Sequence, residues 1–182
     1  MKKNGLVLTI SILILILFVG FFLYFSYLYP VKYLDIIQTY SKEFNLDNNL
    51  VLGVINSESG FNEKAESKSN AIGLMQLKYS TAEEIANKLK IDNFKKEDLF
   101  EPNINIRLGC FYLRYLINYY DGNVKLAICA YNAGLTNVNK WVEDENYIRD
   151  GEIIKIPFAE TEQYLKNILS SQKIYKNYYG IR

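Results

Sequence analysis

Apolar positions divide this chain into one long uninterrupted run and a series of shorter stripes at helical spacing. The run extends from Gly5 to Pro30 without a charge and follows Met1-Lys2-Lys3-Asn4. Its apolar part, from Leu6 to Tyr29, is long enough to cross a bilayer core of roughly 30 Å. Tyrosines gather at its far end, as aromatic side chains do at a membrane interface. The pattern therefore predicts a membrane-spanning helix in residues 1–30.

The residues that flank this run predict its orientation. Lys2 and Lys3 precede it, which favours a cytoplasmic N-terminus and an extracytoplasmic location for residues 31–182. No small-x-small cleavage pattern closes the run, so an uncleaved anchor is favoured over a cleaved signal peptide. A buried core helix is the third interpretation, and it is disfavoured because no polar face interrupts the run. No Gly/Ser-rich linker follows Val31. We therefore expect a single domain, residues 31–182, held close to the cytoplasmic membrane through its N-terminal helix.

Beyond residue 31, apolar side chains recur at the three- and four-residue spacing of amphipathic helices. Helix-start and helix-stop residues flank the stripes: Asp47 as an N-cap, Ser80 and Glu83 at capping-box spacing, Pro102 at a helix start, and Gly134 at a helix end. The predicted helices contain Leu34–Phe44, Leu50–Glu58, Ile85–Leu89, Ile104–Leu116, Val124–Ala133 and, after Pro157, Tyr164–Ile168. No segment alternates convincingly as a strand, although residues 60–77 have room for a short irregular or hairpin segment. The predicted class is all-α with one core.

Composition narrows the chemistry that this domain can perform. Lysines and arginines (21) nearly balance aspartates and glutamates (20), so nothing in the net charge of +1 predicts a nucleic-acid partner. The chain has no histidine, which excludes Ser-His-Asp and Cys-His nucleophilic sites as well as zinc sites built on histidine. Aspartate and glutamate remain as the principal acid–base residues.

The two cysteines, Cys110 and Cys129, both lie in apolar helical stretches. Because cysteine packs as a small hydrophobic residue, two buried thiols are the favoured interpretation. A disulfide is the alternative in an extracytoplasmic domain.

Glu58 is the leading candidate for chemistry. Gly60 suits the left-handed position just past a helix end, which places Glu58 in the last turn on the same stripe as Val54 and Ile55. The negative end of the helix dipole and partial burial both raise the pKa of a carboxyl group at this position. A carboxyl that stays protonated near neutral pH is able to donate a proton to a leaving group. The competing interpretation is a solvated glutamate at a helix end.

Three motifs in order along the chain resemble the lytic transglycosylase domain of the goose-type lysozyme superfamily. They are Glu58-Ser59-Gly60-Phe61-Asn62 followed by Gly73-Leu74-Met75-Gln76; Ala130-Tyr131-Asn132-Ala133-Gly134; and Ile156-Pro157-Phe158 with Glu160-Thr161 and Tyr164. The resemblance implies a lysozyme-like helical domain. It also implies cleavage of the β-1,4 bond between N-acetylmuramic acid and N-acetylglucosamine in peptidoglycan, with no metal or other cofactor.

The resemblance further implies that Glu58 is the single catalytic carboxylate. It would protonate the glycosidic oxygen and then remove the proton from the muramic acid 6-hydroxyl, giving a 1,6-anhydro product. Most glycosidases instead use two carboxylates that flank the bond. Glu63 and Glu66 are near in sequence, but they lie in a polar, lysine-bearing stretch that favours a solvated loop. The missing partner suits an internal nucleophile, although Glu160 and other distant acids could approach in space.

Several residues are implied as substrate contacts by the same resemblance: Ser59, Ser67, Gly73, Met75, Gln76, Tyr131, Asn132 and Tyr164. Some of them have structural alternatives. Ser59 and Asn132 could instead cap helix ends, and Met75 could instead belong to the core. Gly73 is expected to let the chain approach the saccharide closely. Glu160 is expected to be a structural hydrogen-bonding partner. Lys78-Tyr79 departs from the Met-Pro pair common in the family, which affects the local shape of the cleft.

The sequence thus favours a membrane-anchored enzyme of cell-wall remodelling whose partners are peptidoglycan strands and the cytoplasmic membrane. A hydrolytic muramidase on the same scaffold is the enzymatic alternative. A non-catalytic glycan-binding module in an envelope protein complex is the alternative of a different class.

Overall fold

The computed structural model describes residues 2–181, with side chains described from residue 7 onward, and it divides into two units at Val31/Lys32. The first unit consists of α1 (Lys2–Leu28). Within it, Val7–Leu28 has a mean hydropathy of 2.8, and in length and composition this segment is able to cross a membrane. An N-terminal signal sequence shares these properties.

The second unit is helical. Its helices are α2 (Leu34–Glu43), α3 (Asn48–Ser59), α4 (Tyr79–Lys88), α5 (Pro102–Tyr119), α6 (Val124–Ala133), α7 (Leu135–Val142), α8 (Ala159–Tyr178) and the 3₁₀ turn η1 (Lys96–Phe100). Two antiparallel hairpins of two-residue strands accompany them: β1 (Ala71–Ile72) with β2 (Leu77–Lys78), and β3 (Ile148–Arg149) with β4 (Glu152–Ile153). The predicted all-α class is confirmed. The first hairpin falls where a short one was expected, whereas β3–β4 was not predicted.

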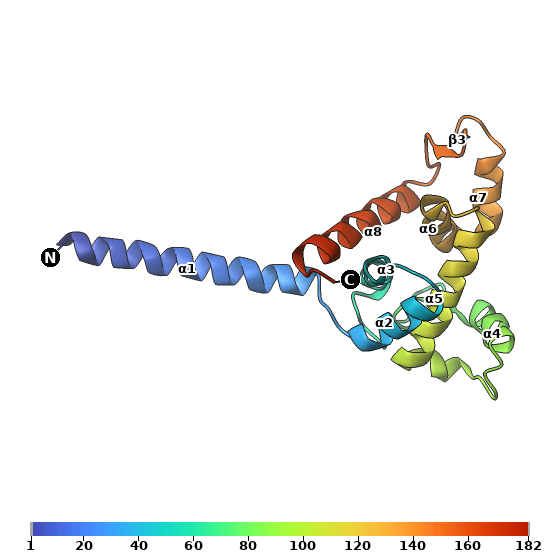
Figure 1. The fold of residues 1–182 in the computed structure, drawn as a ribbon, viewed down its shortest axis with the longest axis horizontal. Coiled ribbons are helices and arrows are strands. Elements are labelled where there is room, and N and C mark those ends of the chain that lie inside the picture. The colour runs from blue at the N-terminus through green and yellow to red at the C-terminus, as the bar shows by residue number, and fades with distance from the viewer. Residues whose placement is uncertain (1, 182) are drawn as a thin grey trace. The chain divides into compact units, whose positions relative to one another are not determined.

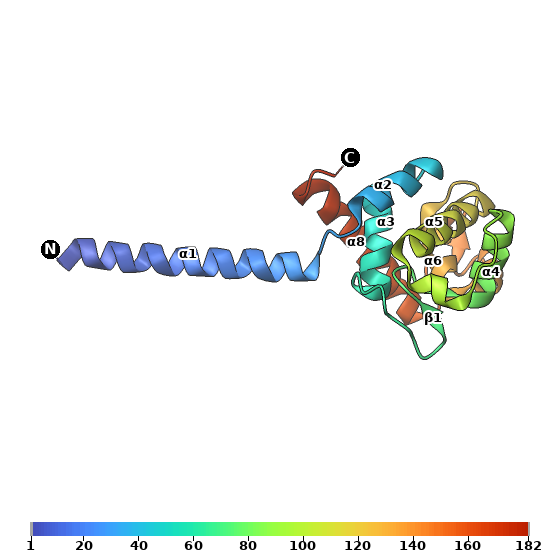
Figure 2. The ribbon, with the colours of Figure 1, turned by 90° about the horizontal axis from the view of Figure 1, so that it is seen from below.

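Helix α3 occupies the centre of the second unit. Every side chain from Asn49 to Ile55 is buried, so this helix is covered on all sides and not along a single stripe. It packs mainly against α8 and also against α2, and α5 in turn contacts α2, α4 and α6 (Figures 1 and 2). A Cβ at Gly53 would lie 3.1 Å from the carbonyl oxygen of Ile168, which shows how closely α8 approaches. The C-terminal end of α3 is thereby fixed in the middle of the domain.

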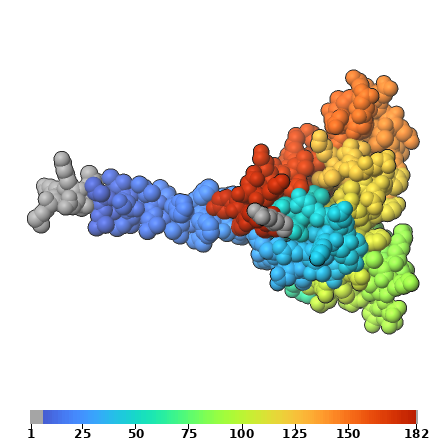
Figure 3. Space-filling model, in the orientation of Figure 1, coloured from blue at the N-terminus to red at the C-terminus, as the bar shows by residue number. Residues whose placement is uncertain are grey.

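Figure 3 shows one face of the second unit as space-filling atoms. The blue and cyan residues of α2 and α3 lie at its centre, the green residues of α4 at the lower right, and the orange residues of α7 and the β3–β4 hairpin at the upper right. The short helices α4 and α7 thus lie at opposite sides of this face.

Helix boundaries follow most of the predicted signals. Asp47 caps α3 by accepting a 2.8 Å hydrogen bond from the backbone N–H of Asn49, and Pro102 is the first residue of α5. The capping box predicted at Ser80 is wrong, because β2 leads directly into α4 and Lys78 takes the N-cap position without a side-chain bond. Gly134, with φ of 83°, ends α6 as predicted but also begins α7, which was not predicted.

Both cysteines are free and fully buried, Cys110 on α5 and Cys129 on α6. The prediction of two buried thiols is confirmed.

Candidate active site

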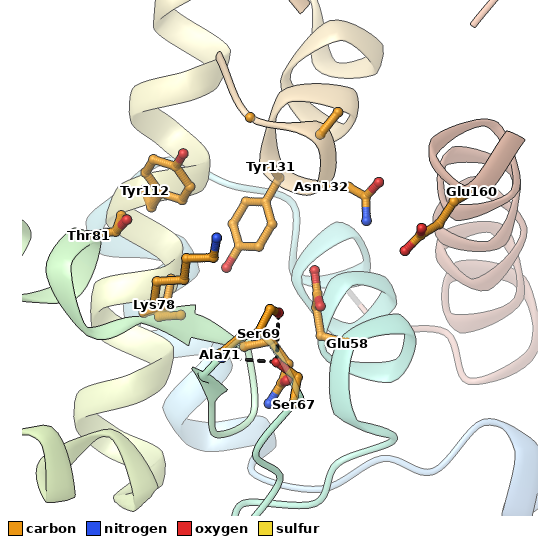
Figure 4. Close-up of a pocket in the computed structure, with 14 residues that line it drawn as sticks. Glu58, Ser67, Ser69, Ala71, Lys78, Thr81, Tyr112, Tyr131, Asn132 and Glu160 are labelled. Carbon is orange, nitrogen blue, oxygen red and sulfur yellow. Dashed lines mark hydrogen bonds between the residues drawn. The ribbon is translucent and has the colours of Figure 1, made fainter. Parts of the chain in front are cut away.

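A cavity of about 560 Å³, here called the main cavity, opens where the end of α3, the β1–β2 loop, α5, α6 and α8 come together (Figure 4). Five of the residues predicted to catalyse or to bind substrate line it: Glu58, Ser67, Gln76, Tyr131 and Asn132. Other lining side chains include Ser69, Lys78, Thr81, Tyr112 and Glu160. The cavity thus collects residues that lie up to about a hundred positions apart in the chain.

Glu58 is the penultimate residue of α3, and Gly60 follows as C-cap with φ of 58°. Its side chain is partly buried, and Oε1 accepts a 2.5 Å hydrogen bond from the hydroxyl of Tyr164. Burial raises the pKa of Glu58 to about 7, while the hydrogen bond from Tyr164 opposes this shift. The pKa moves in the expected direction, and burial is its main cause. A substantial fraction of Glu58 is therefore protonated at neutral pH.

Two tyrosines near Glu58 keep their protons. Burial, together with the charge of Glu58, raises the pKa of both Tyr131 and Tyr164 well above the ordinary value for a tyrosine. Tyr164 uses its proton to bond Glu58, and Tyr131 donates to the carbonyl oxygen of Met75 at 2.8 Å. Both act as fixed hydrogen-bond donors.

The loop between the strands of the first hairpin is held from several directions. The Ser59 hydroxyl donates to the carbonyl oxygen of Leu74 at 2.8 Å, which ties the end of α3 to this loop. Asn105, buried on α5, accepts from the backbone N–H of Met75 at 2.8 Å and donates to the carbonyl oxygens of Ile72 and Leu99. The Asn105 amide was not singled out in the sequence, although an asparagine in an otherwise apolar stripe is a usable signal.

Four residues implied as substrate contacts lie behind the cavity lining: Ser59, Gly73, Met75 and Tyr164. Glycine is required at position 73 because of packing within the protein, and not because of the expected close approach to a saccharide. A Cβ there would lie 2.2 Å from the Leu99 carbonyl oxygen and 2.3 Å from Asn105 Nδ2, and φ is 77°. Met75 is fully buried, which agrees with its alternative assignment to the core.

Ser67 and Gln76 form the hairpin side of the cavity. The Ser67 hydroxyl accepts from the backbone N–H of Ala71 at 3.0 Å and shares a 3.0 Å hydrogen bond with Ser69. Gln76 has a left-handed backbone with φ of 47°, and its amide nitrogen donates to the Gly73 carbonyl oxygen at 2.9 Å. Both polar side chains are thus oriented by the hairpin itself.

Asn132 is oriented from α8. Its Oδ1 accepts a 2.7 Å hydrogen bond from Thr161, which is 1% exposed. Thr161, and not the Glu160 expected as a structural partner, supplies this bond. Glu160 is exposed, lines the main cavity and points toward Asn132 in Figure 4.

The other nearby acids do not line the main cavity. Glu63 accepts a hydrogen bond from Tyr33 at 2.8 Å, and Glu66 pairs with Lys96 at 3.0 Å. Glu58 and Glu160 are the carboxylates among the lining residues. Within residues 2–181, no group of three or more His, Cys, Asp or Glu side chains is placed to hold a metal ion.

A family model described as the transglycosylase SLT domain matches residues 35–153, well over half of the chain. The chain belongs to the transglycosylase SLT domain family. The matched residues include Glu58, the loop that Asn105 holds, Tyr131 and Asn132. They stop before α8, so Tyr164 and Thr161 lie beyond the matched part of the SLT domain.

Individual relatives of this SLT domain chain are similar across most of its length. The soluble lytic murein transglycosylase of Salmonella typhimurium is 30% identical over 155 residues, which are 84% of this chain and 24% of that protein. The membrane-bound lytic murein transglycosylase C of Edwardsiella ictaluri is 31% identical over 80% of this chain and 46% of its own length. The chain thus spans about a quarter to a half of the length of these relatives.

A solved structure shows the same fold. The X-ray structure of an inactive mutant of lytic transglycosylase Slt from Pseudomonas aeruginosa superposes with a TM-score of 0.77 and 34% identity. The match covers 84% of this chain and 25% of that one.

Lys78 and Tyr79 depart from the Met-Pro pair common in the SLT family, and the structure shows what they do here. Lys78 lines the main cavity from the end of β2. Tyr79 points away to α4, where its hydroxyl donates to Glu83 at 2.8 Å and its ring stacks on Phe94. The departure therefore adds a cation to the cavity wall.

Proposed function

We propose that this chain is a peptidoglycan lytic transglycosylase. It cleaves the β-1,4 bond between N-acetylmuramic acid and N-acetylglucosamine and leaves 1,6-anhydromuramic ends. The observation that carries this proposal is Glu58, a partly buried carboxyl group with a pKa of about 7 in a cavity of about 560 Å³. Membership of the SLT family and the relatives named lytic murein transglycosylases support the same substrate.

In the first step, the protonated Glu58 carboxyl donates its proton to the glycosidic oxygen as the bond between C1 and that oxygen breaks. The N-acetylglucosamine side leaves as an alcohol, and C1 of the muramic acid gains oxocarbenium character. A pKa of about 7 suits this step, since it leaves Glu58 protonated often enough to act near neutral pH.

In the second step, the Glu58 carboxylate removes the proton from the 6-hydroxyl of the same muramic acid, and O6 forms a bond to C1. The proton taken from O6 replaces the proton given to the leaving group, so Glu58 is regenerated and no water is consumed. The Tyr164 hydroxyl, which donates to Oε1, stabilises the transient carboxylate and leaves Oε2 to carry the proton.

One observation favours a second candidate, a hydrolytic muramidase. Glu160 also lines the main cavity and would be able to activate a water molecule as the second carboxylate of an inverting enzyme. We assign Glu160 no catalytic role, because its side chain is exposed, whereas the carboxyl group of Glu58 is partly buried. Glu160→Gln should therefore retain lytic activity and 1,6-anhydro products.

The remaining polar lining residues are proposed to bind sugar. Ser67, Gln76, Tyr131 and Asn132 present side chains at the cavity wall, and each is oriented by a protein hydrogen bond. Such oriented polar groups fix a ligand at low entropic cost. Ser59, Gly73, Met75 and Tyr164 are instead proposed to position these groups and Glu58 from behind.

Residues 1–30 are proposed as a single-pass anchor with a cytoplasmic N-terminus, and residues 31–182 as the catalytic domain outside the membrane. The apolar segment Val7–Leu28 and the membrane-bound relative support this arrangement. Membrane fractionation after alkaline washing, with protease treatment of intact spheroplasts, tests it. Release of the chain by the wash, or protection of residues 31–182 from protease, would contradict it. The same location would allow contacts with an envelope protein complex.

The catalytic assignment is tested with purified Glu58→Gln protein and peptidoglycan sacculi. We expect loss of lysis with retained sacculus binding, because glutamine keeps the shape of the side chain but has no proton to transfer. Glu160→Gln serves as the matched control and should lyse sacculi like the unmodified chain. Lysis by Glu58→Gln at the unmodified rate would exclude Glu58 as the catalyst, and loss of both lysis and binding would indicate a folding or binding defect that circular dichroism resolves.

A further inference from the structure

A row of tyrosines connects the main cavity with a second cavity on the same domain. Tyr112, Tyr115 and Tyr119 follow one another at three- and four-residue spacing, so they share one face of α5. Their ring centroids are separated by 6.5 Å and 6.2 Å, and Tyr120 continues the row at 5.0 Å from Tyr119. We call these residues the tyrosine ladder.

The ladder begins inside the main cavity. Tyr112 lines that cavity, and its ring centroid lies 5.2 Å from the ring of Tyr131, another lining residue. From Tyr112 to Tyr119 the helix makes about two turns, a rise of about 10 Å. The aromatic surface therefore runs outward from the proposed cleavage site along α5, which Figure 1 shows passing from α4 toward α7.

The ladder ends at the second cavity, which has a volume of about 580 Å³. Tyr119 and Tyr120 line it together with polar side chains from α7 and the turn after α5, including Asp121, Asn139 and Glu143. Asn139 donates to the Tyr119 hydroxyl at 2.8 Å and accepts from Tyr120 at 2.9 Å. These bonds fix the two rings in position, as a preformed binding surface requires.

The exposure of the rings shows which of them are open to a ligand. Tyr115 and Tyr119 are 41% and 47% exposed, large values for aromatic side chains on a packed helix. Lys88 of α4 lies over the Tyr115 ring, 5.5 Å from its centroid, so Tyr119 offers the more open face. A purely structural row would be expected to bury these rings, since burial of an aromatic side chain is a large source of stability.

We propose that the tyrosine ladder and the second cavity form a distal binding track for the glycan strand. Sugars beyond those held in the main cavity stack on the exposed rings, and carboxylate and amide groups of the second cavity accept and donate hydrogen bonds to their hydroxyl groups. The track is continuous with the main cavity. Its aromatic rings suit the apolar faces of a sugar ring, and its polar side chains suit the hydroxyl groups. This inference rests on the proposed function and extends it, because it makes binding depend on strand length.

The test measures binding in the Glu58→Gln background, where no strand is cleaved. Isothermal titration calorimetry measures the affinity for a peptide-free tetrasaccharide and for long peptide-free glycan strands, both prepared from peptidoglycan. With Tyr119→Leu, the affinity for long strands should fall by about fivefold, which corresponds to an aromatic contact of about 1 kcal/mol. The affinity for the tetrasaccharide should not fall, because the main cavity alone holds it.

Three further variants separate stacking from other effects. Tyr115→Phe keeps the ring and should bind long strands like the parent, whereas Tyr115→Leu should weaken them. Tyr178→Leu removes another exposed tyrosine, on α8 and outside the ladder, and should have no length-dependent effect. Equal losses of affinity for both glycans would overturn the inference. Unchanged affinity for long strands in both Tyr115→Leu and Tyr119→Leu would overturn it as well. If the parent bound neither glycan, the proposed function itself would fail.

Discussion

The hydroxyl group of Tyr164 donates a 2.5 Å hydrogen bond to Oε1 of Glu58, joining α8 to the end of α3 across 106 residues of sequence. Burial raises the pKa of Glu58 to about 7, and this bond limits the rise. The two residues together set how readily the carboxyl group gives and regains a proton.

Removing the Tyr164 hydroxyl should raise the pKa of Glu58 further, because the bond favours the ionised carboxylate. In Tyr164→Phe, the limb on which kcat/KM falls at alkaline pH should therefore move to higher pH. Carbon-13 NMR of the Glu58 carboxyl, assigned by its absence in Glu58→Gln, measures the shift directly. Tyr131→Phe is the control, since its hydroxyl bonds Met75 instead, and it should leave the pKa in place. A lower pKa in Tyr164→Phe would contradict this account.

The raised pKa of Glu58 also predicts how stability depends on pH. The folded state keeps the Glu58 proton to higher pH than the unfolded chain, so this stabilising contribution is complete below about pH 4.5 and is lost as pH rises to about 7. Glu58→Gln should therefore gain up to about 3 kcal/mol relative to the unmodified chain over that interval. Urea unfolding at pH 4.5 and pH 8 measures the difference, and a gain of equal size at both pH values would argue against a buried, proton-linked Glu58.

Two glycines with positive φ should respond differently to alanine. In Gly73→Ala the new Cβ would meet Leu99 and Asn105 at 2.2 Å and 2.3 Å, so we expect a loss of about 3 kcal/mol or more. Gly60→Ala places its Cβ in open space and should cost about 1 kcal/mol from backbone strain alone. Thermal and urea unfolding of both variants make the comparison, and similar losses would show that the loop tolerates a Cβ at position 73.

Asn105 should contribute more to stability than Asn103 of the same helix. Asn105→Ala leaves the backbone N–H of Met75 and the carbonyl groups of Ile72 and Leu99 without their partner, at a cost of about 2–4 kcal/mol. Asn103 is exposed, and Asn103→Ala loses only its bond from Tyr40. Urea unfolding of the two variants should separate them clearly, and a cost for Asn105→Ala below about 1 kcal/mol would refute the role assigned to Asn105.

The two thiols should be unreactive in the folded chain. Burial raises the pKa of Cys129 to about 12 and that of Cys110 well above its usual value, so neither forms thiolate at neutral pH. Ellman's reagent should therefore react slowly with the native domain and should titrate both thiols after unfolding without reductant. Failure to find thiols in the unfolded, unreduced chain would indicate a disulfide.

Much of the helical framework could be predicted because its signals are local. Stripes of apolar residues and the flanking residues Asp47, Pro102 and Gly134 located α3, α5 and α6. Helix α7 was not predicted because Gly134 is both the C-cap of α6 and the N-cap of α7. A glycine that ends one helix does not normally indicate the start of another. The capping box at Ser80 failed because a strand leads directly into α4.

In the candidate site, too, some features could be predicted from local sequence and others could not. The position of Glu58 near the end of a helix, beside an apolar stripe, already predicted a raised pKa from neighbouring residues alone. The partnership of Thr161 with Asn132 and the central role of Asn105 depend on contacts between distant segments, which no local pattern encodes. The packing reason for Gly73 likewise appears only when Leu99 is in place.

In the proposed mechanism, Glu58 acts first as acid and then as base, with the substrate's own hydroxyl group as nucleophile. Mass spectrometry of peptidoglycan digested in water enriched in oxygen-18 distinguishes this mechanism from hydrolysis. We expect 1,6-anhydromuramic ends that carry no oxygen-18, because water does not enter the product. Reducing muramic acid ends labelled with oxygen-18 would contradict it and identify the chain as a hydrolase.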